Sequence, residues 1–105
     1  MNIKEIADLE KSNRNYIYFF ATEDEDFIAY ELSAFLLARL YPSIQLEWKD
    51  FHIANGPLLI ARFSLNFCKD NFCNGNTLVG NDWVRVELED VMSCESWINE
   101  FKNLR

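Results

Sequence analysis

The sequence contains few of the residues that organise loop-rich or repetitive folds. Its 105 residues include three Gly and two Pro, which excludes collagen-like and linker-like architectures and leaves no glycine-rich phosphate-binding loop. Three Cys are too few, and odd in number, for the disulfide framework of a small secreted protein. We therefore expect free thiols and a fold that depends on its hydrophobic core.

Positive charge is also scarce. Ten Lys and Arg stand against 17 Asp and Glu, which gives a net charge of −7. Because nucleic acids bind Lys and Arg side chains that neutralise their phosphates, this balance disfavours a nucleic-acid ligand. Residues 1–10 are too charged for a signal peptide, and no run approaches the ~18 apolar residues of a membrane span. We expect a cytoplasmic protein that binds neither membranes nor nucleic acids.

The chain is nevertheless rich in material for a core. Hydrophobic residues make up 50% of it and aromatic residues 15%, so a chain of this length can bury enough surface to fold without disulfide bonds. The length also fits one folding unit. We predict a single domain, residues 1–105.

The first half of the chain predicts two helices and one strand. Apolar residues at helical spacing indicate a helix over 2–12, and the aromatic run 16–21 is typical of a central strand. Thr22 and Glu25 have the spacing of a capping box, so we expect the next helix to span 23–41. This helix is apolar around most of its surface. It must be enclosed by the sheet and a neighbouring helix, or by a second copy in a homodimer.

The second half predicts strands joined by hairpins. Alternating patterns indicate a half-buried strand over 44–49, ending near Asp50, and a long strand over 58–67. Residues 66–82 are rich in Asn and predict a loop with a short strand at 77–79. A strand over 83–89 and a final helix complete the order α-β-α-β-β-(β)-β-α. We expect an α+β fold in which helices pack on one face of a mainly antiparallel sheet of four to five strands.

Acidic side chains gather in two clusters, which are the candidate binding residues. The first lies in the first turn of the predicted helix, where the helix dipole favours negative charge, and the second lies at the end of the last strand and beyond it. Each offers several carboxylates to a basic protein partner. The candidate partner-binding residues are Glu23, Asp24, Glu25, Asp26, Glu87, Glu89 and Asp90.

Motifs for catalysis and metal binding are weak or missing. Neither a G-x-S-x-G nor an H-E-x-x-H motif occurs, and His52 is the only histidine available to a catalytic system. Cys68 and Cys73 have C-x4-C spacing and suggest a zinc site with His52 and Asp70, but the second pair of ligands would have to be assembled from the only histidine and a carboxylate. We predict no catalytic residue, no metal site and no cofactor.

These observations favour a non-enzymatic, acidic protein-interaction module. It would bind a basic protein and act as an inhibitor of the antitoxin, immunity or nucleic-acid-mimic type. One alternative is a ligand-binding or enzymatic domain with an aromatic pocket under the helix 23–41, and another is a homodimeric structural domain. The pocket would be lined by Tyr30, Phe35, Trp48 and Phe63.

Overall fold

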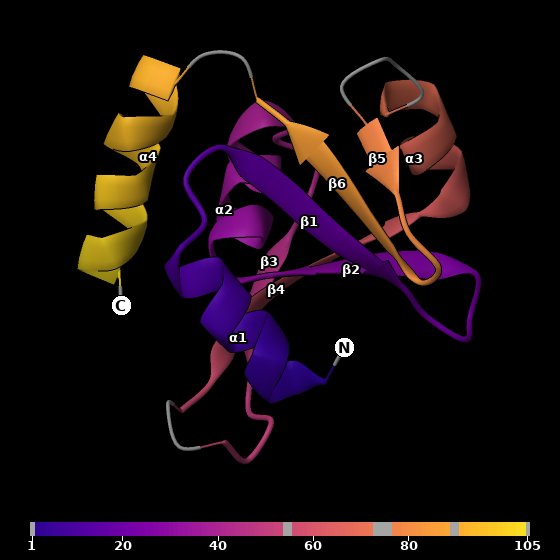
Figure 1. Ribbon diagram of the computed structural model, residues 1–105, viewed down its shortest axis with the longest axis horizontal. Coiled ribbons are helices and arrows are strands. Elements are labelled where there is room, and N and C mark those ends of the chain that lie inside the picture. Colours follow the sequence, from indigo (N-terminus) through magenta and orange to yellow (C-terminus); the bar gives the residue numbers. More distant parts are fainter. Residues whose placement is uncertain (1, 54–55, 73–76, 89–90, 105) are drawn as a thin grey trace.

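The computed structural model describes residues 2–53, 56–72, 77–88 and 91–104 (Figure 1). Within these residues, four helices are separated from one another by three pairs of strands. In chain order they are α1 (Ile3–Lys11), β1 (Tyr16–Ala21), β2 (Asp26–Tyr30), α2 (Glu31–Leu40), β3 (Leu46–Lys49), β4 (Leu58–Ser64), α3 (Leu65–Asn71), β5 (Thr77–Val79), β6 (Trp83–Glu87) and α4 (Val91–Leu104).

The strands form one sheet in the order β3-β4-β2-β1-β6-β5, and every neighbouring pair is antiparallel. The predicted α+β class and the antiparallel sheet are thereby confirmed, with six strands instead of four to five. The predicted first helix, the central strand 16–21, the hairpin of β3 with β4 and the short strand 77–79 are also present.

Helices cover both faces of the sheet. Ile17 and Phe19 of β1 point to the face covered by α2, α3 and α4, where they pack with Leu36 and Phe101. Phe20 points to the opposite face and packs with Ile6 of α1. Figure 1 shows α1 and α2 on opposite sides of the strands. The prediction that all helices lie on one face is therefore wrong for α1, which closes a second, smaller apolar cluster.

The main departure from the sequence prediction lies at residues 22–30. The predicted helix 23–41 starts eight residues later, at Glu31, and residues Asp26–Tyr30 form β2. Phe27 and Ala29 face one apolar cluster, whereas Ile28 and Tyr30 face the other. A strand buried on both faces is apolar at every position, so its pattern resembles that of a buried helix. The tertiary pairing of β2 with β1 and β4 decides between the two.

Helix α2 is enclosed by its own chain. Every residue from Glu31 to Leu37 is buried, and Leu36 and Leu37 have no exposed surface. The sheet and helices α1 and α4 provide this cover. The helix is thus enclosed by the sheet and neighbouring helices, which is one of the two arrangements predicted for it. The homodimer through 23–41 stays a prediction, and the burial of α2 does not require it.

Two further segments differ from the prediction. The long strand ends at Ser64, whose hydroxyl accepts a hydrogen bond from the Phe67 amide at 3.1 Å and so caps α3. This helix replaces the start of the predicted loop, and it places Phe67 on the buried aromatic cluster. Strand β3 is exposed at all four residues, not half-buried, because it is the outermost strand of the sheet.

Candidate functional site

The first acidic cluster forms the tip of the β1–β2 hairpin. The register of the two strands ends at the pair Ala21 and Phe27, and the Thr22 amide then donates to the Asp26 carbonyl at 3.0 Å. The Thr22 hydroxyl bonds the Asp26 carboxylate and accepts from the Asp24 amide at 3.2 Å. These bonds fix the base of the turn. We call residues 23–25 the acidic tip.

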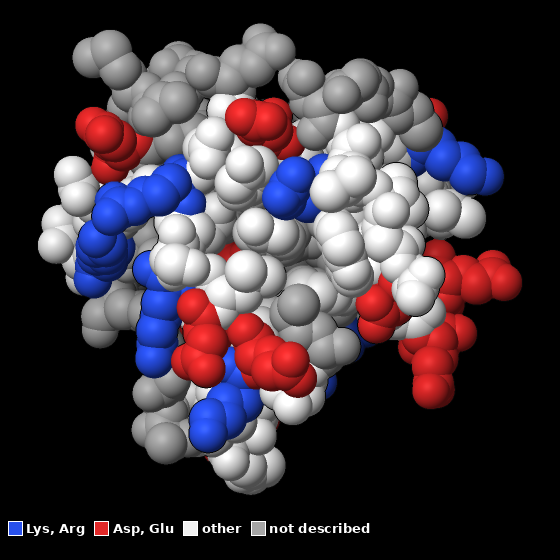
Figure 2. Space-filling model, viewed as in Figure 1, with Lys and Arg blue, Asp and Glu red and all other residues white. Residues whose placement is uncertain are grey.

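The three carboxylates of the acidic tip are exposed to solvent. Figure 2 shows acidic side chains projecting from the right-hand edge of the molecule, where Figure 1 places the β1–β2 turn. Within the described part of the chain, no ion pair involves Glu23, Asp24 or Glu25. Asp26 behaves differently, since its carboxylate is half-buried and lies 3.9 Å from the Arg62 guanidinium. The capping box predicted for Thr22 and Glu25 is absent because no helix begins here.

Among the candidate residues that the structure describes, Glu87 does not lie beside the acidic tip. Glu87, at the end of β6, pairs with Tyr16 at the start of β1, whereas the acidic tip follows Ala21 at the other end. Five residues of extended chain separate these ends by about 17 Å. Glu89 and Asp90 lie outside the described residues. Of the candidate residues, Glu23, Asp24 and Glu25 thus form one exposed group, and Glu87 stands apart from it.

A buried carboxylate, which the sequence analysis missed, links α1 to α2. Glu10 is 5% exposed, and its oxygens accept hydrogen bonds from the Ser33 amide at 2.8 Å and the Ser33 hydroxyl at 2.7 Å. The Asn13 side chain donates a third bond at 3.3 Å. A signal was present in the sequence, since Glu10 continues the apolar stripe of Ile6 and Ala7 at helical spacing.

This carboxylate supplies a cap that α2 lacks. The N-cap residue Tyr30 makes no side-chain cap bond, and Ser33 is the third residue of the helix. Glu10 therefore satisfies from α1 an amide at the start of α2, where the helix dipole favours negative charge. Desolvation nevertheless dominates and raises the pKa of Glu10 to about 7, with a smaller upward contribution from the nearby Glu31 carboxylate.

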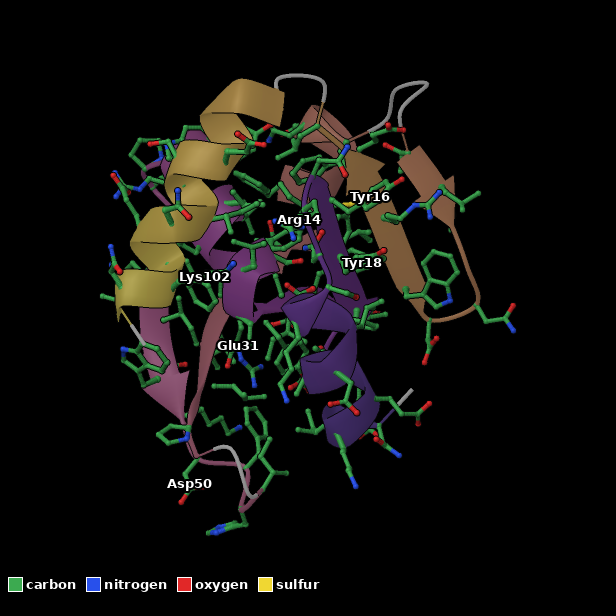
Figure 3. All side chains as sticks on the ribbon, turned by 60° about the vertical axis from the view of Figure 1, so that its left-hand side comes forward. Arg14, Tyr16, Tyr18, Glu31, Asp50 and Lys102 are labelled. Carbon is green, nitrogen blue, oxygen red and sulfur yellow. The ribbon has the colours of Figure 1, made fainter. Side chains whose placement is uncertain are left out.

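A cavity of about 240 Å³ lies beside Glu10, between α1, α2 and α4. Its walls are largely apolar, with Lys11 and Lys102 also among the lining residues. Figure 3 shows Lys102 of α4 and Glu31 at the start of α2, and both line this space. The apolar lining residues are Ala7, Leu32, Leu58, Ile98 and Phe101.

The predicted aromatic pocket does not form. Tyr30 belongs to the apolar cluster under α1, whereas Phe35 and Phe63 belong to the cluster on the opposite face. Trp48 is 45% exposed on the edge strand β3. Tyr30 therefore cannot line one pocket together with Phe35 and Phe63, because the sheet lies between them.

The candidate metal ligands are also dispersed. Cys68 is partly buried and packs against the main apolar cluster, as expected of a cysteine that behaves as a small apolar residue. The side chain of His52 is 91% exposed and lies 3.7 Å from Asp50. Cys73 is outside the described residues. Among those that are described, no three His, Cys, Asp or Glu side chains are grouped so as to hold a metal ion.

Comparison of the chain with models of known protein families, with curated proteins and with solved structures finds no match. In the described part of the chain, no helix combines the length and apolar character needed to cross a membrane.

Proposed function

We propose that this protein is a non-enzymatic interaction module that binds a basic protein through the acidic tip, residues 23–25. The observation that carries this proposal is the exposure of three consecutive carboxylates on a hairpin whose base is fixed by hydrogen bonds. A cytoplasmic location and an inhibitory role accompany the proposal. Inhibition follows if the partner uses the same basic surface for its own ligand.

A hydrogen-bonded turn that carries three exposed charges supports this function. Charges at the rim of an interface increase the association rate and fix the orientation of the partners. The acidic tip is suited to both effects. The hydrogen bonds between Thr22 and Asp26 restrict its backbone, and no cation among the described residues neutralises its side chains. Lys or Arg side chains of a partner could form ion pairs with these carboxylates without first breaking an ion pair within this chain.

The cavity beside Glu10 supports a competing function less well. A general acid or base must reach the proton of its substrate, and a binding carboxylate needs free acceptor positions. The Glu10 oxygens instead accept three hydrogen bonds from Ser33 and Asn13. We assign these bonds to the joining of α1 and α2.

The proposal is tested by neutralising two charges of the tip. The variant E23Q/E25Q and the control D70N/E95Q each change the net charge from −7 to −5, and all four positions are exposed. Each tagged protein is used to capture partners from native lysate at low salt, and bound proteins are quantified by mass spectrometry. We expect the tip variant to capture at least about tenfold less of a basic partner than the natural chain. The control variant should capture as much as the natural chain.

Equal loss from both variants would show that net charge matters and the tip does not. Retention by both would exclude the tip as the docking surface. A further variant, E87Q, tests the second cluster by itself. Glu87 pairs with Tyr16, at the end of β1 that is remote from the acidic tip. The effect of E87Q on capture should therefore be independent of the effect of the tip variant.

A further inference from the structure

One edge of the sheet has an unusual composition. Strand β3 is the outermost strand, hydrogen-bonded to β4 on one side, and all four of its residues are exposed. Leu46 and Trp48 are 36% and 45% exposed, and their partners in β4 both point to the face that carries α2. Proteins normally protect such edges, because an open strand with apolar side chains pairs readily with other strands. The exposed edge of β3 is therefore a candidate site for pairing with a strand of another chain.

The sequence of β3 is complementary to itself. Glu47 and Lys49 flank Trp48 and point to the same face of the strand. If two copies of β3 pair antiparallel about a two-fold axis at Trp48, Glu47 of each copy lies opposite Lys49 of the other. The two Trp48 side chains then lie side by side on the other face. This register places opposite charges, not like charges, in both cross-strand positions.

We infer that the occupant is a second copy of this chain, bound edge to edge through β3, so that the two six-stranded sheets become one continuous sheet. The contact is isologous and closes at two copies. Within the described residues, no ion pair involves Glu47 or Lys49, so both charges are available for the pairing. Lys49 lies over the Phe51 ring at 5.3 Å, on its own copy.

The opposite edge of the sheet does not offer the same complementarity. Strand β5 carries the exposed Leu78 and Val79 but no charged residue. Pairing of β3 with β5 of another copy would leave both charges of β3 unmatched. Such a contact would also be heterologous and would build open chains instead of closed dimers.

The contact is short, so the association should be weak. Stable interfaces bury about 1,200–2,000 Å² in total, more than two four-residue strands provide. We therefore expect a dimer that dissociates in the micromolar range or above. The experiment must cover protein concentrations from about 5 to 500 µM to span that range.

Sedimentation equilibrium of the full chain and three variants tests the inference. The single charge reversals E47K and K49E place like charges opposite each other twice per dimer, and each should weaken dimerisation about tenfold. The double variant E47K/K49E exchanges the two charges and restores both opposite-sign pairs. It should therefore recover the association of the natural sequence, at the same net charge. Circular dichroism confirms that each variant is folded.

Recovery in the double variant is the decisive result, because no unrelated partner or register would show it. A natural chain that stays monomeric at all concentrations overturns the inference. So does a double variant that remains as weak as the single ones. Growth beyond a dimer would point instead to heterologous contacts between β3 and β5.

Discussion

The buried Glu10 carboxylate should make this protein less stable as the pH rises. Its pKa is raised from 4.5 to about 7 by burial, so the folded protein keeps a proton that the unfolded chain has lost between these values. Stability therefore falls as the pH increases through this window and levels off above it. A shift of this size corresponds to about 3 kcal/mol at full extent.

The substitution Glu10→Gln isolates this effect. Gln is neutral at every pH and resembles the protonated acid, so it keeps an acceptor for the Ser33 amide without burying a charge. Urea unfolding at intervals from pH 5 to pH 8 measures the free energy of unfolding of both proteins. We expect the natural chain to lose about 2.5 kcal/mol relative to the Gln variant over this range, because part of the change already occurs below pH 5.

The difference between the two proteins removes the contribution of groups that titrate alike in both. Glu31 is the charged neighbour most able to complicate it, because its carboxylate raises the pKa of Glu10 and would itself respond to the loss of that charge. A difference that is constant from pH 5 to pH 8 would contradict a raised pKa of Glu10. A natural chain that gains stability relative to the variant as the pH rises would contradict it as well.

Two further substitutions test the local geometry. Ser33→Ala removes the hydroxyl that donates to Glu10 and accepts from the Tyr18 amide at 2.9 Å. Urea unfolding should show that the free energy of unfolding falls by about 1–3 kcal/mol. A decrease below about 0.5 kcal/mol would mean that these bonds contribute little to stability. Glu25→Gly should raise the melting temperature, because Glu25 has a φ of 61° that glycine adopts without strain. The expected increase in the free energy of unfolding is about 1 kcal/mol. The control Glu23→Gly, at a neighbouring position without a positive φ, should lower it or leave it unchanged, and an equal response of both would contradict the strain argument.

The sequence predicted the elements whose patterns are local. The strict alternation of the 83–87 strand and the aromatic run of 16–21 each need only their own residues to be recognised. The strand β2 could not be recognised in this way, because Phe27 and Ile28 pack on opposite faces and no charged residue from Phe27 to Tyr30 marks the period. Without a polar face, helical and extended readings fit equally well. The acids 23–26 then favoured the helix, since they resemble a first turn.

The candidate site shows the same limit. Exposure of the acidic tip follows from composition alone, but its distance from Glu87 depends on the antiparallel register of β1 with β2 and β6. The role of Glu10 depends on a contact with Ser33, 23 residues away in the chain. Its place on the apolar stripe of α1 marks it as buried, and only the fold shows which amide it caps.

Salt should separate the two proposed interactions. Docking of a basic partner on the acidic tip is an attraction between exposed charges, so it weakens as salt shortens their range to about 8 Å at physiological ionic strength. Two copies of this chain each carry −7 and repel each other at long range. Salt screens this repulsion more than it screens the close Glu47 and Lys49 pairs, which act over one strand spacing. Dimerisation through β3 should therefore hold or strengthen under conditions that release the partner, and the two surfaces can be tested independently in one titration.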